Sequence, residues 1–275
     1  MAFLETNNSK SEWRRDSMSD DVRGRFMWYE LLTSDPDAAI DFYTSLIGWS
    51  TAPFDAGGQE YTMWMRGEVP VGGVMLLPEE AASGGAPPHW LAYVGTSDVD
   101  ATVEQAGQLG ASVLVPPMTI LDAGRFSVLQ DPQGVVIAAI TPPEAPPPTE
   151  EPSPGCFSWH ELATTDYEAA FDFYSTLFGW EKQETMDMGE AGIYQMYGVG
   201  GPPLGGMFNR HAEMPVSAWL YYILVDDVET AAARVTELGG LVVNGPMEVP
   251  GGSRIAQCSD PQGAMFAVHS VAKDG

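Results

Sequence analysis

The chain of 275 residues has 12 Lys and Arg against 38 Asp and Glu, which gives a formal net charge of −26 at pH 7. Negative charge of this size repels phosphate groups, so we expect neither nucleic acid nor an anionic membrane as a partner. With 44% hydrophobic residues the chain is too apolar to be disordered, and its length predicts about two domains.

The N-terminal stretch from Met1 to Arg25 is polar and lacks the apolar centre of a signal peptide. No apolar run approaches the roughly 20 residues of a membrane-spanning helix. The two cysteines, Cys156 and Cys258, fit a reducing compartment and cannot form a zinc site alone. We therefore expect a cytoplasmic protein.

An internal repeat determines the predicted architecture. Residues 25–49 and 156–180 align at a constant offset of 131, and 14 of the 25 aligned positions are identical. A second block recurs after 129 residues and includes the run Asp-Pro-Gln-Gly. Between the copies, the chain is rich in proline and acidic residues, as extended linkers are. The predicted organisation is a disordered N-terminal segment 1–23, a first domain 24–142, a linker 143–154 and a second domain 155–271.

The elements of the first copy follow from hydrophobic periodicity and from capping residues. Asp35 is the expected N-cap of a helix that Gly48 ends, and Asp98 and Gly110 enclose a second helix in the same way. Strands are expected at 26–32, 60–66, 71–77, 90–94, 125–130 and 135–140. The second copy repeats the pattern, with strands that include 157–163, 192–197, 204–208 and 219–225. Each copy therefore reads as β-α-β-β followed by β-α-β-β.

The repeated motifs resemble those of a known superfamily. They are Asp35-x-x-x-Ala39-x-x-Phe42-Tyr43-x-x-x-x-Gly48-Trp49, Asp98-Val99-Asp100, Leu109-Gly110 and Asp131-Pro132-Gln133-Gly134. This pattern is similar to that of the vicinal oxygen chelate superfamily, which includes glyoxalase I, extradiol dioxygenases and the bleomycin and fosfomycin resistance proteins. The resemblance implies an α+β fold of tandem paired βαβββ modules. Four such modules would form two cup-shaped domains, paired as an internal pseudo-dimer.

The superfamily's metal ligands can be sought position by position. The first, usually a His on the opening strand, is replaced by Trp28 and Trp159, and the last, usually a Glu, by Ala138 and Ala267. The strand that usually carries the middle ligand contains no His in either copy, although His89 stands just before the first of them. Since indole and methyl groups cannot bind a divalent ion, we predict no metal and no other cofactor.

The opening strand of each copy carries a Trp and a Glu two residues apart. The period of two places Trp28 with Glu30, and Trp159 with Glu161, on the same face of a strand. A carboxyl beside an indole in a poorly hydrated cavity should have a raised pKa, which suits a general acid or base. The alternative is structural: each Glu accepts from backbone or arginine donors within the barrel, and the arginines that match between the copies are Arg125 and Arg254.

Two histidines are further candidates for acid–base chemistry. His160 lies on the opposite face of its strand from Trp159 and is expected to pack against helices. His269 shares the face of Ala267 near the rim and has no counterpart in the first copy. The candidate catalytic residues are therefore Glu161, Glu30, His269 and His160. The candidate ligand-binding residues are Trp28, Trp159, Trp90, Trp219, Arg125, Arg254, Tyr61 and Tyr194.

The aromatic and methionine content favours a flat, mostly apolar ligand, because rings stack and thioethers adapt. One hypothesis is a protein that sequesters a planar aromatic compound, similar to the antibiotic resistance proteins of the bleomycin-resistance branch. A second is a metal-free tailoring enzyme of secondary metabolism that acts on an aromatic metabolite. The alternatives are a metal-dependent glyoxalase or dioxygenase and a protein-binding module. The expected partner is a small aromatic molecule, and the chain is expected to be a monomer or a homodimer.

Overall fold

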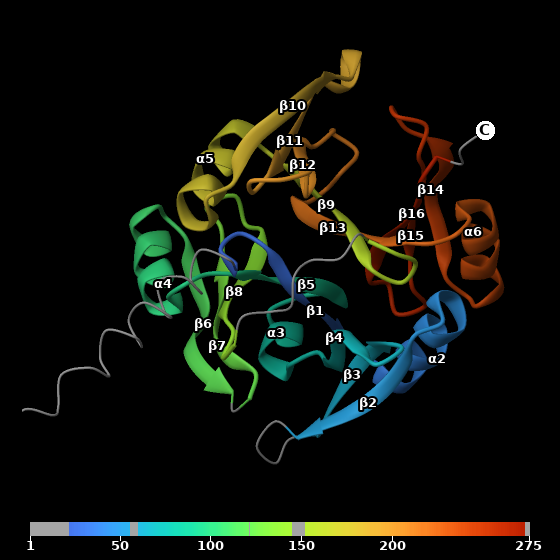
Figure 1. Cartoon of the computed structure of the whole chain (residues 1–275), viewed down its shortest axis with the longest axis horizontal. Helices are drawn as coiled ribbons and strands as arrows, with labels where there is room; N and C mark the ends of the chain where they lie inside the picture. Colours follow the sequence, from blue (N-terminus) through green and yellow to red (C-terminus); the bar gives the residue numbers. More distant parts are fainter. Residues whose placement is uncertain (1–21, 56–59, 121, 145–151, 273–275) are drawn as a thin grey trace, which may run out of the picture.

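A computed structural model describes residues 22–55, 60–120, 122–144 and 152–272 (Figure 1). Each copy of the repeat builds one eight-stranded sheet. The strand order is β2-β3-β4-β1-β5-β8-β7-β6 in the first sheet and β10-β11-β12-β9-β13-β16-β15-β14 in the second. The same order in both sheets shows that the two copies share one α+β fold.

Each domain contains two βαβββ modules, joined edge to edge through the antiparallel pair of their first strands. The elements of domain 1 are β1 (Phe26–Thr33), α2 (Pro36–Ile47), β2 (Ser50–Asp55), β3 (Glu60–Arg66), β4 (Val69–Leu76), α3 (Glu79–Ser83), β5 (His89–Gly95), α4 (Val99–Gln108), β6 (Ser112–Ile120), β7 (Gly124–Gln130) and β8 (Val136–Thr141). Those of domain 2 are β9 (Phe157–Thr164), α5 (Tyr167–Phe178), β10 (Glu181–Asp187), a 3₁₀ turn (Gly189–Ala191), β11 (Ile193–Gly198), β12 (Gly205–Asn209), β13 (Ala218–Leu224), α6 (Val228–Glu237), β14 (Leu241–Glu248), β15 (Arg254–Ser259) and β16 (Met265–Ser270).

The strand prediction from periodicity was incomplete, because it lacked one strand in every module. The missing strands are β2, β6, β10 and β14, of which β2, β6 and β14 contain proline. Each lies at a sheet edge and exposes most of its side chains, so it carries little alternation of apolar and polar residues. The β-α-β-β pattern is therefore corrected to βαβββ, the module that the resemblance implies.

The helix ends follow the capping residues. The side chain of Asp35 accepts a hydrogen bond from the backbone of Ala38 at 3.1 Å, and Pro36 opens α2. Gly48 ends this helix in the left-handed conformation, with φ at 81°. Asp166 and Gly179 do the same for α5.

The helices of one domain pack beside those of the other. Figure 1 shows α4 next to α5 and α2 next to α6, at opposite sides of the molecule. Reciprocal hydrogen bonds join the domains: the hydroxyl of Tyr43 donates to Asp260 at 3.3 Å, and that of Tyr174 donates to Asp131 at 2.9 Å. The indoles of Trp49 and Trp180 likewise donate to backbone carbonyls of the other domain. Equivalent residues thus make equivalent contacts across the interface.

Two segments of the predicted organisation fall mainly outside the described residues. Of the N-terminal segment 1–23, the structure describes only Val22 and Arg23. Val22 is buried, and Arg23 donates to the carbonyl of Thr176 at 3.2 Å. Residues 145–151 of the linker 143–154 are likewise not described. Within the described ranges, none of the helices combines the length and the apolar character that spanning a bilayer requires.

Candidate functional site

Each sheet has one face that packs against helices and the other domain, and a second face that we call the inner face. The inner face of domain 1 carries Trp28, Glu30 and Leu32, and that of domain 2 carries Trp159, Glu161 and Ala163. The intervening residues Tyr29 and His160 meet in the core between the domains. The predicted pairing of Trp with Glu on one face is therefore confirmed in both copies.

In domain 1, two tyrosines connect the Trp with the Glu. The indole Nε1 of Trp28 donates to the hydroxyl of Tyr61 at 2.9 Å. Tyr93 donates its hydroxyl to Oε2 of Glu30 at 2.7 Å, and Tyr61 hydrogen-bonds to the same carboxyl. Glu30 is 7% exposed.

Domain 2 repeats this cluster with its own residues. The indole of Trp159 donates to the hydroxyl of Tyr194 at 2.7 Å. Tyr194 donates to Oε2 of Glu161 at 3.1 Å, and Tyr222 donates to Oε1 at 3.1 Å. Gln257 lies next to Tyr222, and its amide nitrogen is 3.2 Å from the hydroxyl of that tyrosine.

Glycines on the neighbouring strand allow the tyrosines to reach the carboxyl. A Cβ at Gly73 would lie 1.8 Å from the hydroxyl of Tyr61, and a Cβ at Gly206 would lie 1.9 Å from the ring of Tyr194. Both glycines pair directly with the Glu of the opening strand. Any side chain at these positions would displace the tyrosine, so Gly73 and Gly206 are part of the site.

The electrostatic setting of both carboxyls is the same. Burial raises the pKa of Glu30 and of Glu161, and the hydrogen bonds from the tyrosines oppose this rise. The donors that hydrogen-bond to these carboxyls are neutral phenols and an amide. Each carboxyl therefore holds its proton to a higher pH than an exposed glutamate does.

The alternative ion pairs with arginine are wrong. Arg125 binds Asp100 through its Nε at 2.6 Å, and Arg254 binds Glu229 in the same manner. Arg125 directly precedes Phe126, whose ring packs near Tyr93 on the inner face. The alternation of the strand therefore turns both arginines toward the helices, away from the predicted ligand-binding cluster.

The other candidates lie in two different places. Trp90 and Trp219 are 5% and 8% exposed in the core between the domains, so the structure does not place them on an inner face. His160 lies in the same core, 2.5 Å from the hydroxyl of Tyr29, away from the carboxyls. His269 is half-buried at the end of β16, where its Nδ1 lies 3.1 Å from the hydroxyl of Ser158.

Sequence reasoning missed Tyr93, Tyr222 and Gln257. The two tyrosines lie opposite Trp28 and Trp159 in the pairing of the first strands of the modules. They also match each other at the offset of 129 residues. This match within the repeat is the signal that could have identified them.

Comparison with known proteins now establishes the family. The model of the Glyoxalase/Bleomycin resistance protein/Dioxygenase superfamily matches residues 25–139 and 157–268. The chain belongs to this superfamily.

Curated relatives of the superfamily match over most of their length. "Putative glyoxylase CFP32" of Mycobacterium tuberculosis is 33% identical over 243 residues, which cover 88% of this chain and 92% of the relative. "Anthracycline biosynthesis protein DnrV" of Streptomyces peucetius is 32% identical over 254 residues, which cover 88% of this chain and 91% of the relative.

Solved structures of the superfamily share the fold. The Mn(II)-bound glyoxalase from Novosphingobium aromaticivorans has a TM-score of 0.62 at 16% identity, over 93% of this chain and 84% of that one. The 2,3-dioxygenase LapB from Pseudomonas sp. KL28 has a TM-score of 0.62 at 12% identity, over 93% and 94% of the two chains.

The inner faces do not fit the divalent metal that members of this superfamily bind. Ala138 and Ala267 pair with Tyr93 and Tyr222 at the centre of each sheet, where a methyl group offers no ligand. Among the residues that the structure describes, no three His, Cys, Asp or Glu side chains come together in a way that could hold a metal ion. The oxygens of each Glu instead accept hydrogen bonds from tyrosines.

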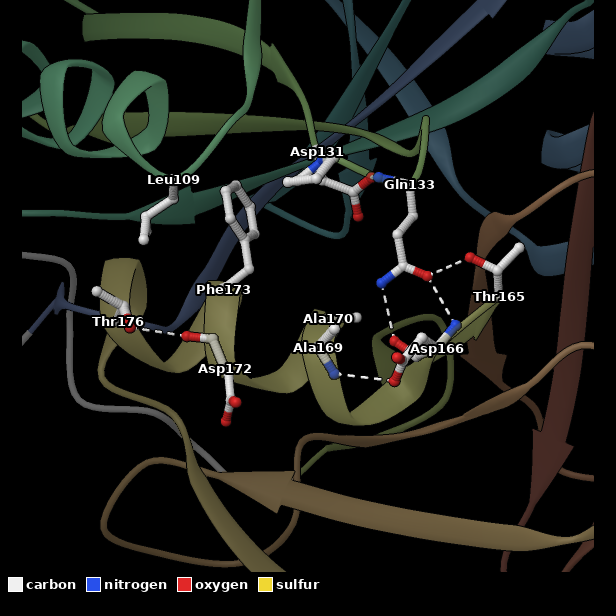
Figure 2. A pocket seen from close by; sticks show the side chains of 11 residues that line it. Leu109, Asp131, Gln133, Thr165, Asp166, Ala169, Ala170, Asp172, Phe173 and Thr176 are labelled. Atoms are coloured by element: carbon white, nitrogen blue, oxygen red, sulfur yellow. Dashed lines mark hydrogen bonds between the residues drawn. The ribbon is translucent and has the colours of Figure 1, made fainter.

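A groove of about 570 Å³ lies elsewhere, between α4 and α5 (Figure 2). Its apolar lining includes Leu109 and Phe173, and Gln133 spans one end to accept hydrogen bonds from Thr165 and from the backbone of Asp166. The carboxyl of Asp131 also lines this groove, but its oxygens accept from Tyr174 and from backbone amides. The groove is thus part of the contact between the domains.

Proposed function

We propose that this chain acts in the metabolism of an aromatic natural product and binds a planar aromatic metabolite on an inner face. The observation that carries this proposal is the duplicated cluster in which a partly exposed Trp, two tyrosines and a Glu are joined by hydrogen bonds. The ring would stack on Trp159 or Trp28, and Glu161 or Glu30 would be the adjacent polar group.

The residues around the Trp favour a flat ligand over a compact polar one. Trp159 and Tyr194 are partly exposed, and the ring of Phe208 stacks on Tyr194 at a centroid distance of 5.9 Å. Aromatic walls with few polar groups are typical of sites that bury most of a drug-sized ring system. A ligand of this kind in good contact would bind with a micromolar Kd, which corresponds to about −8 kcal/mol.

Glu161 is the group that we expect to move a proton. Because burial raises its pKa, the carboxyl keeps its proton to a higher pH than an exposed glutamate does and can donate it to an oxygen of the ligand. Tyr194 and Tyr222 would then stabilise the carboxylate that remains, since each points a hydroxyl hydrogen at one of its oxygens. The same pair of hydrogen bonds fixes the orientation of the carboxyl before the ligand binds.

The relatives support an aromatic substrate class. Two of them are named as anthracycline biosynthesis proteins, and anthracyclines contain a planar fused-ring system. A tailoring enzyme that uses Glu161 as acid and base is the function that we favour. If the chain binds the ligand but does not convert it, the function is instead sequestration of a toxic aromatic compound.

A fluorescence titration of the purified chain with an anthracyclinone tests the proposal. We expect the ligand to quench tryptophan emission, and Trp159→Ala to weaken binding about fivefold or more, equivalent to about 1 kcal/mol of stacking. Glu161→Gln should bind the ligand with little change and lose turnover. Unchanged affinity in both Trp159→Ala and Trp28→Ala would place the site elsewhere.

Elemental analysis of the same preparation tests the prediction that the site works without a metal. We expect no stoichiometric divalent ion and no effect of a chelator on ligand binding or turnover. About one metal ion per domain, together with activity lost to the chelator, would favour the glyoxalase or dioxygenase alternative.

A further inference from the structure

The two inner faces share a backbone but differ at matched positions. Asn244 pairs with Gln257 between β14 and β15, and Val115 pairs with Val128 between the corresponding strands β6 and β7. These positions are separated by 129 residues, the offset of the second block of the repeat. Domain 2 therefore has two neighbouring amides where domain 1 has two valines.

In domain 1, apolar side chains fill the inner face. They form a hydrophobic cluster separate from the core between the domains, and its buried members are Leu32, Leu77, Leu91, Tyr93, Val128 and Ala138. Leu77 follows β4, and Ala81 of the short helix α3 packs against the same cluster. Both pack on the sheet that carries Glu30, which is itself buried.

In domain 2, the matched positions are open. Glu161, Ala163, Leu220 and Gln257 are all partly exposed, whereas their counterparts Glu30, Leu32, Leu91 and Val128 are all buried. The connection between β12 and β13, residues 210–217, is described throughout and forms no helix. Domain 2 thus lacks a counterpart of α3 and keeps its inner face accessible.

A series of amides leads from the carboxyl to the rim of domain 2. The amide nitrogen of Gln257 lies 3.5 Å from Oε1 of Glu161 and 3.2 Å from the hydroxyl of Tyr222. The amide of Asn244 donates to Oε1 of Gln257 at 3.4 Å, and Asn244 is exposed. An amide both donates and accepts hydrogen bonds, so this series can pair with a hydroxyl or a carbonyl oxygen. A ligand without such an oxygen would leave these groups unpaired when it covers them.

We infer that the inner face of domain 2 is the single ligand site of the chain and that Gln257 and Asn244 recognise an oxygen substituent at the edge of the ring. The ligand class is then a hydroxylated planar aromatic, such as a hydroxyquinone. Domain 1 contributes a filled copy of the same face that stabilises the fold. This inference rests on the proposed function for its ligand, although the difference in accessibility between the two faces does not depend on it.

A labelling experiment without ligand tests the accessibility of the two faces. Val128→Cys and Gln257→Cys are introduced separately into a Cys156→Ser background, in which the remaining Cys258 is buried. We expect a thiol reagent to modify the cysteine at position 257 at least about tenfold faster than that at position 128. Equal rates at the two positions would overturn the inference of one open site.

A ligand titration tests the role of the amides. The probes are quinizarin, which is a dihydroxyanthraquinone, and anthracene, whose rings carry no oxygen. We expect about one quinizarin per chain, and about a tenfold loss of quinizarin affinity in Gln257→Val, the fold-change that corresponds to about 1.4 kcal/mol for a lost hydrogen bond. Anthracene affinity should change less than about twofold. Asn244→Val should also weaken quinizarin binding more than binding of the probe without oxygen. Because Asn244 is exposed, this variant keeps the test valid if Gln257→Val does not fold.

Val115→Asn, which adds the amide to domain 1, is the matched control and should change neither affinity.

Two equivalents of quinizarin per chain would overturn the inference and leave the proposed function in place. Equal losses for both probes in Gln257→Val and Asn244→Val would overturn the role of the amides. If neither probe quenches the wild-type chain, the proposed ligand class is wrong, and the labelling rates still decide whether domain 2 alone is open.

Discussion

At the scale of single residues, the alternation of the opening strand predicted the site only in part. It correctly placed Trp28 with Glu30 and turned His160 to the opposite face, because the period of two is local to one strand. The partners of each Glu come from other strands: Tyr61 from β3 and Tyr93 from β5. Their approach depends on the pairing of distant strands, which periodicity does not encode. The ion pairs expected with arginine failed for the same reason.

Replacement of Glu30 should make the stability of the chain less sensitive to a rise in pH from acidic to neutral. Burial raises the pKa of Glu30, so the folded state holds this proton more tightly than the unfolded state does. The stabilising contribution is fully present below the ordinary glutamate pKa and is lost as the pH rises through the raised pKa. Each tenfold difference in proton affinity is worth about 1.4 kcal/mol.

We therefore expect Glu30→Gln to gain free energy of unfolding relative to wild type as the pH increases from acidic to neutral. Urea denaturation over that range measures the difference. Parallel curves for the two proteins would show that Glu30 titrates as an exposed carboxyl.

At the scale of secondary-structure elements, the helices and inner strands could be predicted because their caps and apolar periodicity are strong. The edge strands β2, β6, β10 and β14 could not, since their pairing rests on backbone contacts with one inner neighbour. The Asp-Pro-Gln-Gly run was recognised as a repeated motif between two predicted strands, but its role in the contact between the domains was not predicted. In the fold, Asp131 also accepts a hydrogen bond from Tyr174 of the other domain.

Asp131→Ala should be strongly destabilising for this reason. One carboxylate oxygen accepts from the amides of Gln133 and Val135, both at 2.8 Å, and the other accepts from Tyr174. Loss of these bonds leaves buried donors unpaired, so we expect the free energy of unfolding to fall by about 2–4 kcal/mol. Tyr174→Phe, which removes one bond only, should cost about 1 kcal/mol. Equal losses in the two variants would mean that the turn does not depend on Asp131.

At the scale of the whole molecule, the two domains share one aromatic core. Tyr29 and His160 occupy equivalent positions of the repeat and meet at its centre, as residues on a two-fold axis do. Phe26 stacks on His160 and Phe157 stacks on Tyr29, each at a centroid distance of 3.7 Å. The sequence predicted the duplication, but the contact between the copies follows from how the sheets pack.

This core should make the fold sensitive to acid. Nδ1 of His160 donates to the carbonyl of Leu204, so Nε2 accepts from Tyr29 and the ring is neutral. Burial lowers the pKa of His160 from 6.5 to about 4. The stabilising contribution is therefore present above pH 6.5 and is lost as the pH falls through about 4.

The glutamine of His160→Gln stays neutral at every pH. We therefore expect the free energy of unfolding of this variant to fall by about 3 kcal/mol less than that of wild type as the pH decreases from 6.5 to about 4. Buried carboxyls with raised pKa values act in the opposite sense, so the measured quantity is the difference between variant and wild type in urea denaturation. An identical acid dependence in both proteins would contradict a neutral, buried His160.

The most direct test of the central claim is a crystal structure of the chain with quinizarin bound. We expect one ligand on the inner face of domain 2, with its ring stacked on Trp159 and a ring oxygen within hydrogen-bond distance of Gln257. A ligand seated in the groove between α4 and α5, or on the inner face of domain 1, would contradict the claim.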